Sequence, residues 1–172
     1  MPRGLKATSS TVAIGFDVAE TAPSTFTQST VDLNLDPLNL EVFVVQAIDL
    51  QADFPDNIAG ISTTVNSAMT TTSQTAMPTL SDTNCLAITE SQIRQEFGAA
   101  LAAGVGFQSN SMDTPPAGLE YIGIIATNNF FLQVEGTSNG NIKQLQGKLY
   151  GYRARADASI YSALVQSEVL SA

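Results

Sequence analysis

The amino-acid sequence predicts an all-β protein, a single-domain β-sandwich, with the eight-stranded jelly roll as the first choice of topology. Segments in which apolar and polar residues alternate recur along the chain, as half-buried strands require. Turn-forming residues separate these segments at intervals typical of sandwiches. The length of 172 residues suits one hydrophobic core.

The first ten residues are expected to form a flexible arm, and residues 11–172 the sandwich domain. Alternation over residues 12–18 and again over 31–35 predicts two half-buried strands. Residues 40–50 form a near-continuous, β-branched apolar run, which predicts a strand covered on both faces.

The middle of the chain is less regular. Nine of the fourteen residues from 62 to 75 are Ser or Thr, which predicts a polar strand or an extended loop. Residues 84–88 predict a short strand. An inserted helix is predicted near residues 90–103, because Thr89 and Gln92 have capping-box spacing. Its apolar side chains would pack against a sheet, and these are Ile93, Phe97 and Leu101.

The last third contains the longest alternation. Residues 119–126 predict one strand, and Phe130 to Ala156 predict a hairpin of long strands that turns at Asn139-Gly140. Gly147 and Gly151 lie on one face of that hairpin, where another element can approach closely. Asp157 could cap a short final helix, although a further strand there stays open.

Composition argues against an enzyme. The chain has no histidine, and only 13% of its residues are charged, against about 25% in a typical soluble domain. Without histidine, no side chain titrates near neutral pH unaided. The single Cys85 has no partner for an internal disulfide and is expected in the core. No catalytic residue and no cofactor is expected.

The net charge of −9, from 16 acidic and 7 basic residues, argues against a direct nucleic-acid site and against docking to an anionic membrane. No stretch approaches the roughly 18–20 apolar residues that span a bilayer, and the N-terminus lacks the apolar region of a secretory signal. We therefore expect synthesis in the cytoplasm.

Asp49, Asp53 and Asp56 are the candidate metal ligands, because oxygen-rich loops bind calcium. Their spacing matches no EF-hand and Asp is an ordinary turn residue, so the turn interpretation is preferred. Four of the seven basic residues lie within thirteen positions near the C-terminus, split between the two faces of a strand. With two from the N-terminal arm, they are the candidates for charge pairing between subunits: Arg3, Lys6, Lys143, Lys148, Arg153 and Arg155.

Several segments resemble short proteins encoded by marine viruses. They are residues 31–45, residues 119–128 and residues 148–157, including the run Lys-Leu-Tyr-Gly-Tyr-Arg-Ala-Arg-Ala-Asp. In size and pattern the chain is also similar to the single jelly-roll coat proteins of tailless icosahedral viruses.

The resemblance implies a virion structural protein, a coat subunit that self-assembles into a symmetric shell and is made in the host cytoplasm. Its expected partners are copies of itself, with a second capsid protein as a further candidate. A surface poor in charge fits such burial against other copies. The alternative is a viral spike or a lectin-like jelly roll that binds a carbohydrate or receptor. That class usually clusters aromatic residues at loop tips, whereas this chain has no Trp.

Overall fold

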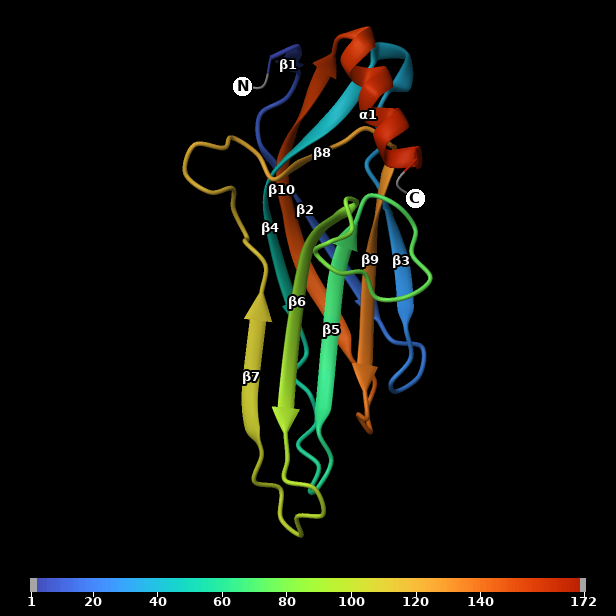
Figure 1. Ribbon diagram of the computed structural model, residues 1–172. Coiled ribbons are helices and arrows are strands. Elements are labelled where there is room, and N and C mark those ends of the chain that lie inside the picture. Colours follow the sequence, from blue (N-terminus) through green and yellow to red (C-terminus); the bar gives the residue numbers. More distant parts are fainter. Residues whose placement is uncertain (1–2, 171–172) are drawn as a thin grey trace.

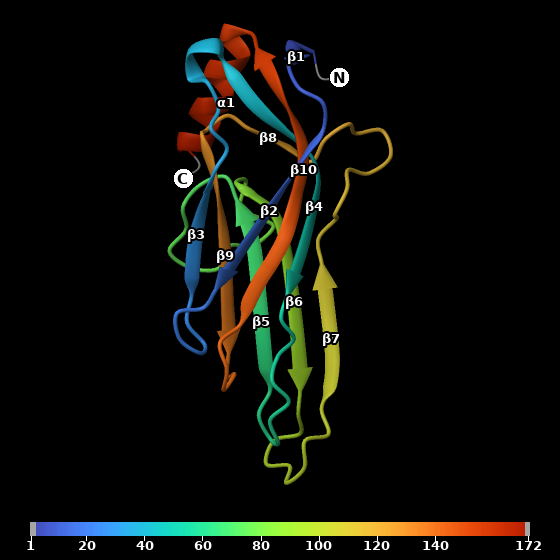
Figure 2. The same cartoon turned by 180° about the vertical axis from the view of Figure 1, so that it is seen from behind.

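The computed structural model describes residues 3–170, which form two antiparallel sheets packed face to face and one C-terminal α-helix (Figures 1 and 2). The first sheet contains β1 (Leu5–Ala7), β2 (Val12–Ala19), β4 (Glu41–Ala52), β8 (Gly123–Ile125) and β10 (Gln144–Ala156). The second contains β3 (Thr27–Asp32), β5 (Thr63–Thr70), β6 (Cys85–Arg94), β7 (Val105–Asn110) and β9 (Asn129–Thr137). The helix α1 is Ala158–Leu170, and a 3₁₀ turn covers Pro37–Asn39.

The strand order confirms the predicted jelly roll. The first sheet runs β2-β10-β4-β8 and the second β3-β9-β5-β6, so the chain changes sheet at most connections. These eight strands are the two Greek keys of a jelly roll. Strand β1 is added beside β2 on β10, and β7 is added beyond β6 as an edge strand.

The core lies between the two sheets. Phe16 and Phe130 meet there edge to face, with ring centroids 5.9 Å apart. Side chains from both sheets surround them in one cluster, among them Val45, Ile48, Val65, Met69, Leu132, Val134, Leu145 and Leu149.

Gly147 and Gly151 provide the close approach that the sequence predicted. A Cβ on Gly147 would lie 2.1 Å from the carbonyl oxygen of Asp49 and 2.7 Å from the ring of Phe16. A Cβ on Gly151 would lie 2.5 Å from the ring of Phe43. Each glycine therefore makes room for an aromatic ring against the long strand β10.

A second, smaller cluster covers the outer face of the first sheet at one end. Val42 and Val44 of β4 point to this side, away from the main core, and pack beneath α1. Strand β4 is thus covered on both faces, as its apolar run predicted. The final helix is also confirmed, with its apolar positions Ile160, Tyr161, Leu164 and Val165 in this cluster.

The helix predicted near residues 90–103 is wrong. Residues 85–94 are strand β6, which pairs with β5 on one side and with β7 on the other. Thr89 therefore lies within a strand and caps no helix, and its hydroxyl bonds the Asn110 side chain. Beyond Arg94 the chain forms a loop, in which Phe97 is 98% exposed and packs against no sheet.

The hairpin predicted from Phe130 to Ala156 is also wrong, although its two strands exist. Strand β9 belongs to the second sheet and β10 to the first, so the segment between them crosses the sandwich. Asn139 does not form a two-residue turn. Its side-chain amide donates to the Thr64 carbonyl at 2.8 Å and its oxygen accepts from the Asp56 amide at 2.8 Å. These contacts hold the crossing segment against neighbouring loops.

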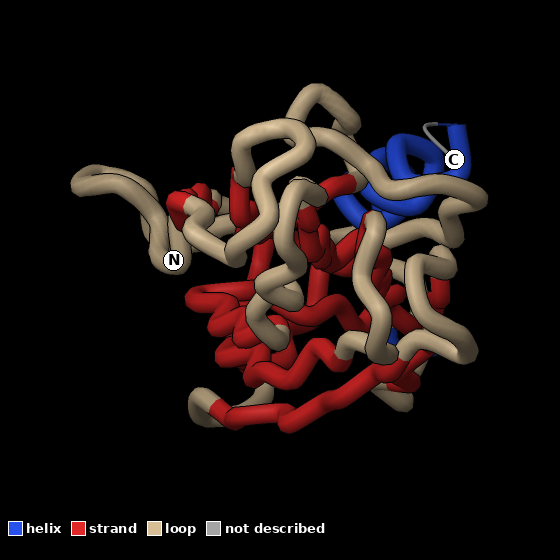
Figure 3. Tube along the Cα trace, turned by 90° about the horizontal axis from the view of Figure 1, so that it is seen from below, coloured by secondary structure: helices blue, strands red, loops and turns tan. Residues whose placement is uncertain are grey.

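The expected arm is partly ordered in the sheet. Leu5–Ala7 pair with Ala154–Ala156 of β10, and Leu5 is buried. The sheet therefore extends into residues that the sequence assigned to the arm, while residues 1 and 2 lie outside the described part of the chain. The segment between β7 and β8, by contrast, loops out from the body of the sandwich (Figures 1 and 3).

Candidate subunit-contact surface

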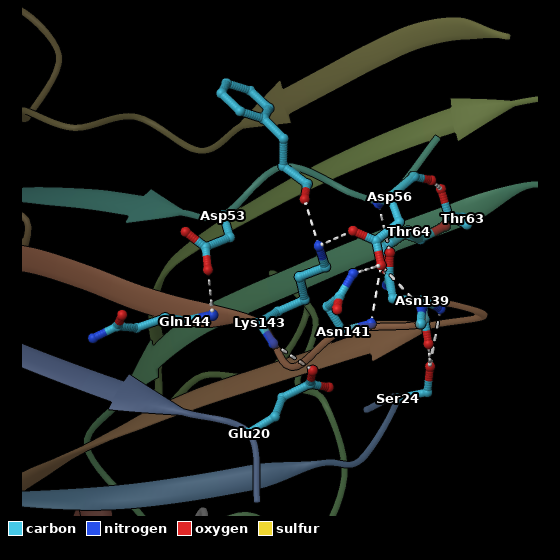
Figure 4. A network of polar contacts seen from close by, with 12 residues as sticks. Glu20, Ser24, Asp53, Asp56, Thr63, Thr64, Asn139, Asn141, Lys143 and Gln144 are labelled. Atoms are coloured by element: carbon cyan, nitrogen blue, oxygen red, sulfur yellow. Dashed lines mark hydrogen bonds and ion pairs between the residues drawn. The ribbon is translucent and has the colours of Figure 1, made fainter. Parts of the chain in front are cut away.

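Two of the six basic residues proposed for subunit contacts are bound within the chain, and Lys143 is one of them. Its ammonium donates to Asp56 Oδ1 at 2.7 Å and to the Phe54 carbonyl at 2.9 Å (Figure 4). Its side chain is only 6% exposed. The second oxygen of Asp56 accepts from the backbone amides of Gly140 and Asn141 at 2.9 and 3.0 Å.

The Lys143 ammonium beside Asp56 holds the pKa of that carboxyl below its usual range, and hydrogen bonds from Asn141 act in the same direction. Below this pair, the buried Glu20 accepts from the amides of Gly136 and Lys143 at 2.7 and 2.8 Å (Figure 4). The network joins the segment between β9 and β10 to two other loops. The role of this network is to stabilise the fold.

Arg153 is the second internally bound cation. Its guanidinium donates to the carbonyls of Leu33 and Asn34 at 2.7 and 3.0 Å, and to Glu41 Oε2 at 3.2 Å. These bonds tie the chain segment that follows β3 to the centre of the first sheet.

The other four basic residues, Arg3, Lys6, Lys148 and Arg155, are exposed. Arg155 stands opposite Lys6 on one side and Glu41 on the other, and Lys148 stands opposite Asp49. These four stay predictions as subunit contacts.

The three candidate metal ligands each have a different role in the fold. Asp49 is exposed on β4, opposite Lys148, while Asp53 accepts from the Gln144 amide at 2.9 Å and Asp56 binds Lys143. Within residues 3–170, no group of three or more His, Cys, Asp or Glu side chains is placed to hold a metal ion.

Cys85 lies at the start of β6 and is partly buried. Burial raises the pKa of its thiol to about 11, and the nearby Asp82 charge adds to the increase. The side chain is therefore protonated at neutral pH, and its thiol donates to the Ala87 carbonyl at 3.6 Å.

The most conspicuous surface feature is one that the sequence reading missed. Strand β7 and the loop before it expose large apolar side chains: Phe97 (98%), Leu101 (78%), Val105 (60%) and Phe107 (54%). We call these four residues, with the rest of β7, the β7 surface. All six residues of β7 are exposed, and in Figure 1 this strand forms the free edge of its sheet.

The β7 surface is anchored to the body by polar contacts and one ring contact. The side-chain oxygen of Gln95 accepts from the Ala103 backbone amide at 3.2 Å, and the Gln95 backbone amide donates to Ser62 Oγ at 3.1 Å. The guanidinium of Arg94 lies 5.6 Å from the centre of the Phe107 ring. These contacts tie the loop before β7 to the body of the sandwich.

A groove of about 320 Å³ runs beside β7 and is lined mainly by apolar atoms of Phe54, Pro55, Ile93, Gly106 and Phe107. Phe54 is itself 73% exposed at its rim. The groove therefore adds exposed apolar area beside the β7 surface.

No family model and no curated protein matches the chain. Among solved structures, the chain is similar to one from Desmodium yellow mottle tymovirus, with a TM-score of 0.32 and 10% sequence identity, over 92% of this chain and 96% of that one.

Proposed function

We propose that the chain is a virion coat subunit that self-assembles through contacts between its own copies. The observation behind this proposal is the β7 surface, which exposes Phe97, Leu101 and Phe107 on a protein with only 13% charged residues. Contiguous exposed apolar surface on a soluble protein usually marks a contact with another protein or with a membrane.

The jelly-roll frame supports this role physically. Two packed sheets form a rigid block, and its long strands hold edge strands and loops in fixed positions where neighbouring copies can contact them. The resemblance of residues 31–45, 119–128 and 148–157 to short marine-virus proteins supports a virion location and synthesis in the host cytoplasm. A second capsid protein would be a further partner.

The polar groups that could have served catalysis have structural roles. Lys143, Asp56 and Glu20 stabilise the segment between β9 and β10, and the Cys85 thiol is protonated at neutral pH. We therefore propose a non-enzymatic function. No helix among the described residues is long and apolar enough to cross a membrane.

Light scattering and negative-stain electron microscopy of the purified chain at micromolar concentration test the proposal. We expect closed particles of uniform size, in equilibrium with small oligomers. A protein that stays monomeric at all concentrations, in low and high salt, would contradict it. A discrete trimer that forms no shell and binds glycans on an array would favour the spike or lectin-like alternative.

A further inference from the structure

We infer that two copies of the chain join edge to edge through β7, antiparallel about a two-fold axis, so that their second sheets form one continuous sheet. This inference rests on the proposed self-assembly and names the surface that performs it. Its basis is the backbone of β7, the side chains that flank it and the charges on β6.

The free edge of β7 has unpaired backbone groups. Ser111 donates its amide to the Ile88 carbonyl at 2.9 Å, in register with the β6–β7 ladder. Alternation along an antiparallel ladder then turns the odd residues Phe107 and Ser109 toward β6. Gly106, Gln108 and Asn110 consequently direct their N–H and C=O groups to the open edge, where no residue of the described chain bonds them.

Nothing on β7 opposes pairing with another strand. Proteins usually protect edge strands with charges, prolines or short length. Strand β2 carries Asp17, β3 carries Asp32, and β8 has only three residues. Strand β7 has six residues, Val-Gly-Phe-Gln-Ser-Asn, with neither charge nor proline.

The charges on β6 select a register. Opposite residues of an antiparallel pair share a face, so Phe107 can stand against Phe107 of the second copy. Within each copy, Arg94 pairs with Val105 and Glu90 pairs with Ser109. One row across the joined sheet then contains, in order, Arg94 and Val105 of one copy and Ser109 and Glu90 of the second copy. The row spans about 14 Å, or three strand spacings, so the arginine of one copy and the glutamate of the other attract each other along it. The two-fold axis repeats this row, so the contact contains two such pairs of opposite charges.

Exposed apolar side chains would supply part of such a contact. The four exposed side chains of the β7 surface amount to on the order of 500 Å² per copy, against about 800 Å² for each partner in a standard interface. Antiparallel pairing also places the loop before β7 beside the segment after β7 of the other copy. Leu101 would there meet Met112, which is 67% exposed.

Substitution of Gln108 by proline tests the inference. The Gln108 amide points away from β6, so proline removes a donor that only a second copy would use. Sedimentation velocity should show that Q108P loses the dimer and every larger particle at concentrations where wild type assembles. The matched control Q108T keeps the amide and should assemble like wild type. A charge on the opposite edge of the same sheet, T30K, should also leave assembly unchanged.

Disulfide trapping provides a second measurement that does not depend on the proline variant folding. In a Cys85→Ser background, Phe107→Cys should form a disulfide-linked dimer under mild oxidation, because opposed non-hydrogen-bonded residues have Cα atoms about 4.5 Å apart. Thr30→Cys should not.

The outcomes separate the two proposals. If wild type assembles while Q108P assembles equally and F107C gives no cross-link, the β7 contact is overturned and the coat function stands. If wild type is strictly monomeric, the coat function itself is overturned. Loss of assembly in Q108P together with the F107C cross-link supports the β7 contact.

Discussion

At the scale of single residues, Asp56 illustrates how the fold uses its few charges. It accepts from the Lys143 ammonium and from two backbone amides, so one carboxylate holds the segment that crosses between the sheets. Replacing Asp56 with Ala leaves the buried ammonium with only the Phe54 carbonyl. We expect a loss of about 3 kcal/mol in the free energy of unfolding, measured by urea denaturation. Asp53→Ala, which removes an exposed carboxylate without an ion pair, should cost less than about 1 kcal/mol.

The same residue predicts a pH dependence. The pKa of Asp56 in the folded protein lies below its ordinary value of 3.8, so its contribution is fully present above that value and is lost as pH falls through the lowered folded pKa. The stability difference between wild type and Asp56→Asn should therefore be largest above pH 3.8 and should shrink as the pH falls below 3.8 through the lowered folded pKa. A difference that stays constant across this range would contradict the assignment.

Gly147 and Gly15 form a matched pair on neighbouring strands. A Cβ on Gly147 would lie 2.1 Å from a backbone oxygen, whereas a Cβ on Gly15 would have nothing within 4 Å. Gly147→Ala should therefore destabilise the protein by about 3 kcal/mol, since backbone and the Phe16 ring must shift. Gly15→Ala should be neutral or slightly stabilising. Thermal unfolding of the two variants makes the comparison, and equal melting temperatures would refute this packing.

At the scale of elements, the helix α1 is fastened near its C-terminal end. The buried Glu168 accepts from the amides of Ala126 and Thr127 at 2.8 and 3.0 Å. Glu168→Ala should leave these amides unsatisfied, cost about 2 kcal/mol and let α1 open. Hydrogen exchange should then accelerate over residues 158–170. The exposed Gln166→Ala is the control and should leave exchange unchanged.

Some elements could be predicted from the sequence and others could not. The apolar run of residues 40–50 was readable because β4 is covered on both faces, by the main core and by α1. The helix near residues 90–103 was misread because Thr89 and Gln92 suit a cap as well as a strand. The long pairing of β6 with β5 decides between the two, and it joins residues that lie 15 to 30 positions apart in the chain.

The crossing between β9 and β10 shows a second limit. The dipeptide Asn139-Gly140 is a local turn signal, but Asn139 bonds Asp56 and Thr64, which are distant in sequence. No local pattern reports such partners. The β7 surface was missed for a related reason, since exposed and buried apolar residues look alike in a sequence until the strands that cover them are placed.

At the scale of the whole molecule, position within a sheet should decide how fast each strand exchanges its amides. Strands β5, β9 and β10 are paired on both sides, and β7 on one side only. We expect the slowest exchange in residues 130–135 and 144–153, and also in the Ser- and Thr-rich β5, for which the sequence allowed an extended loop as well as a strand. Fast exchange throughout β5 would contradict its central place.

The proposed assembly predicts a pattern of amide exchange that only edge-to-edge pairing of β7 produces. In dispersed protein, the amides of Gly106, Gln108 and Asn110 point to solvent and should exchange quickly, while those of Phe107 and Ser109 bond β6. When particles form, the first three should slow and the other two change little, as measured by NMR-detected exchange on dissociated samples. If all five slow equally, β7 is merely covered by a neighbouring copy. If none slows, the contact between copies lies on another surface.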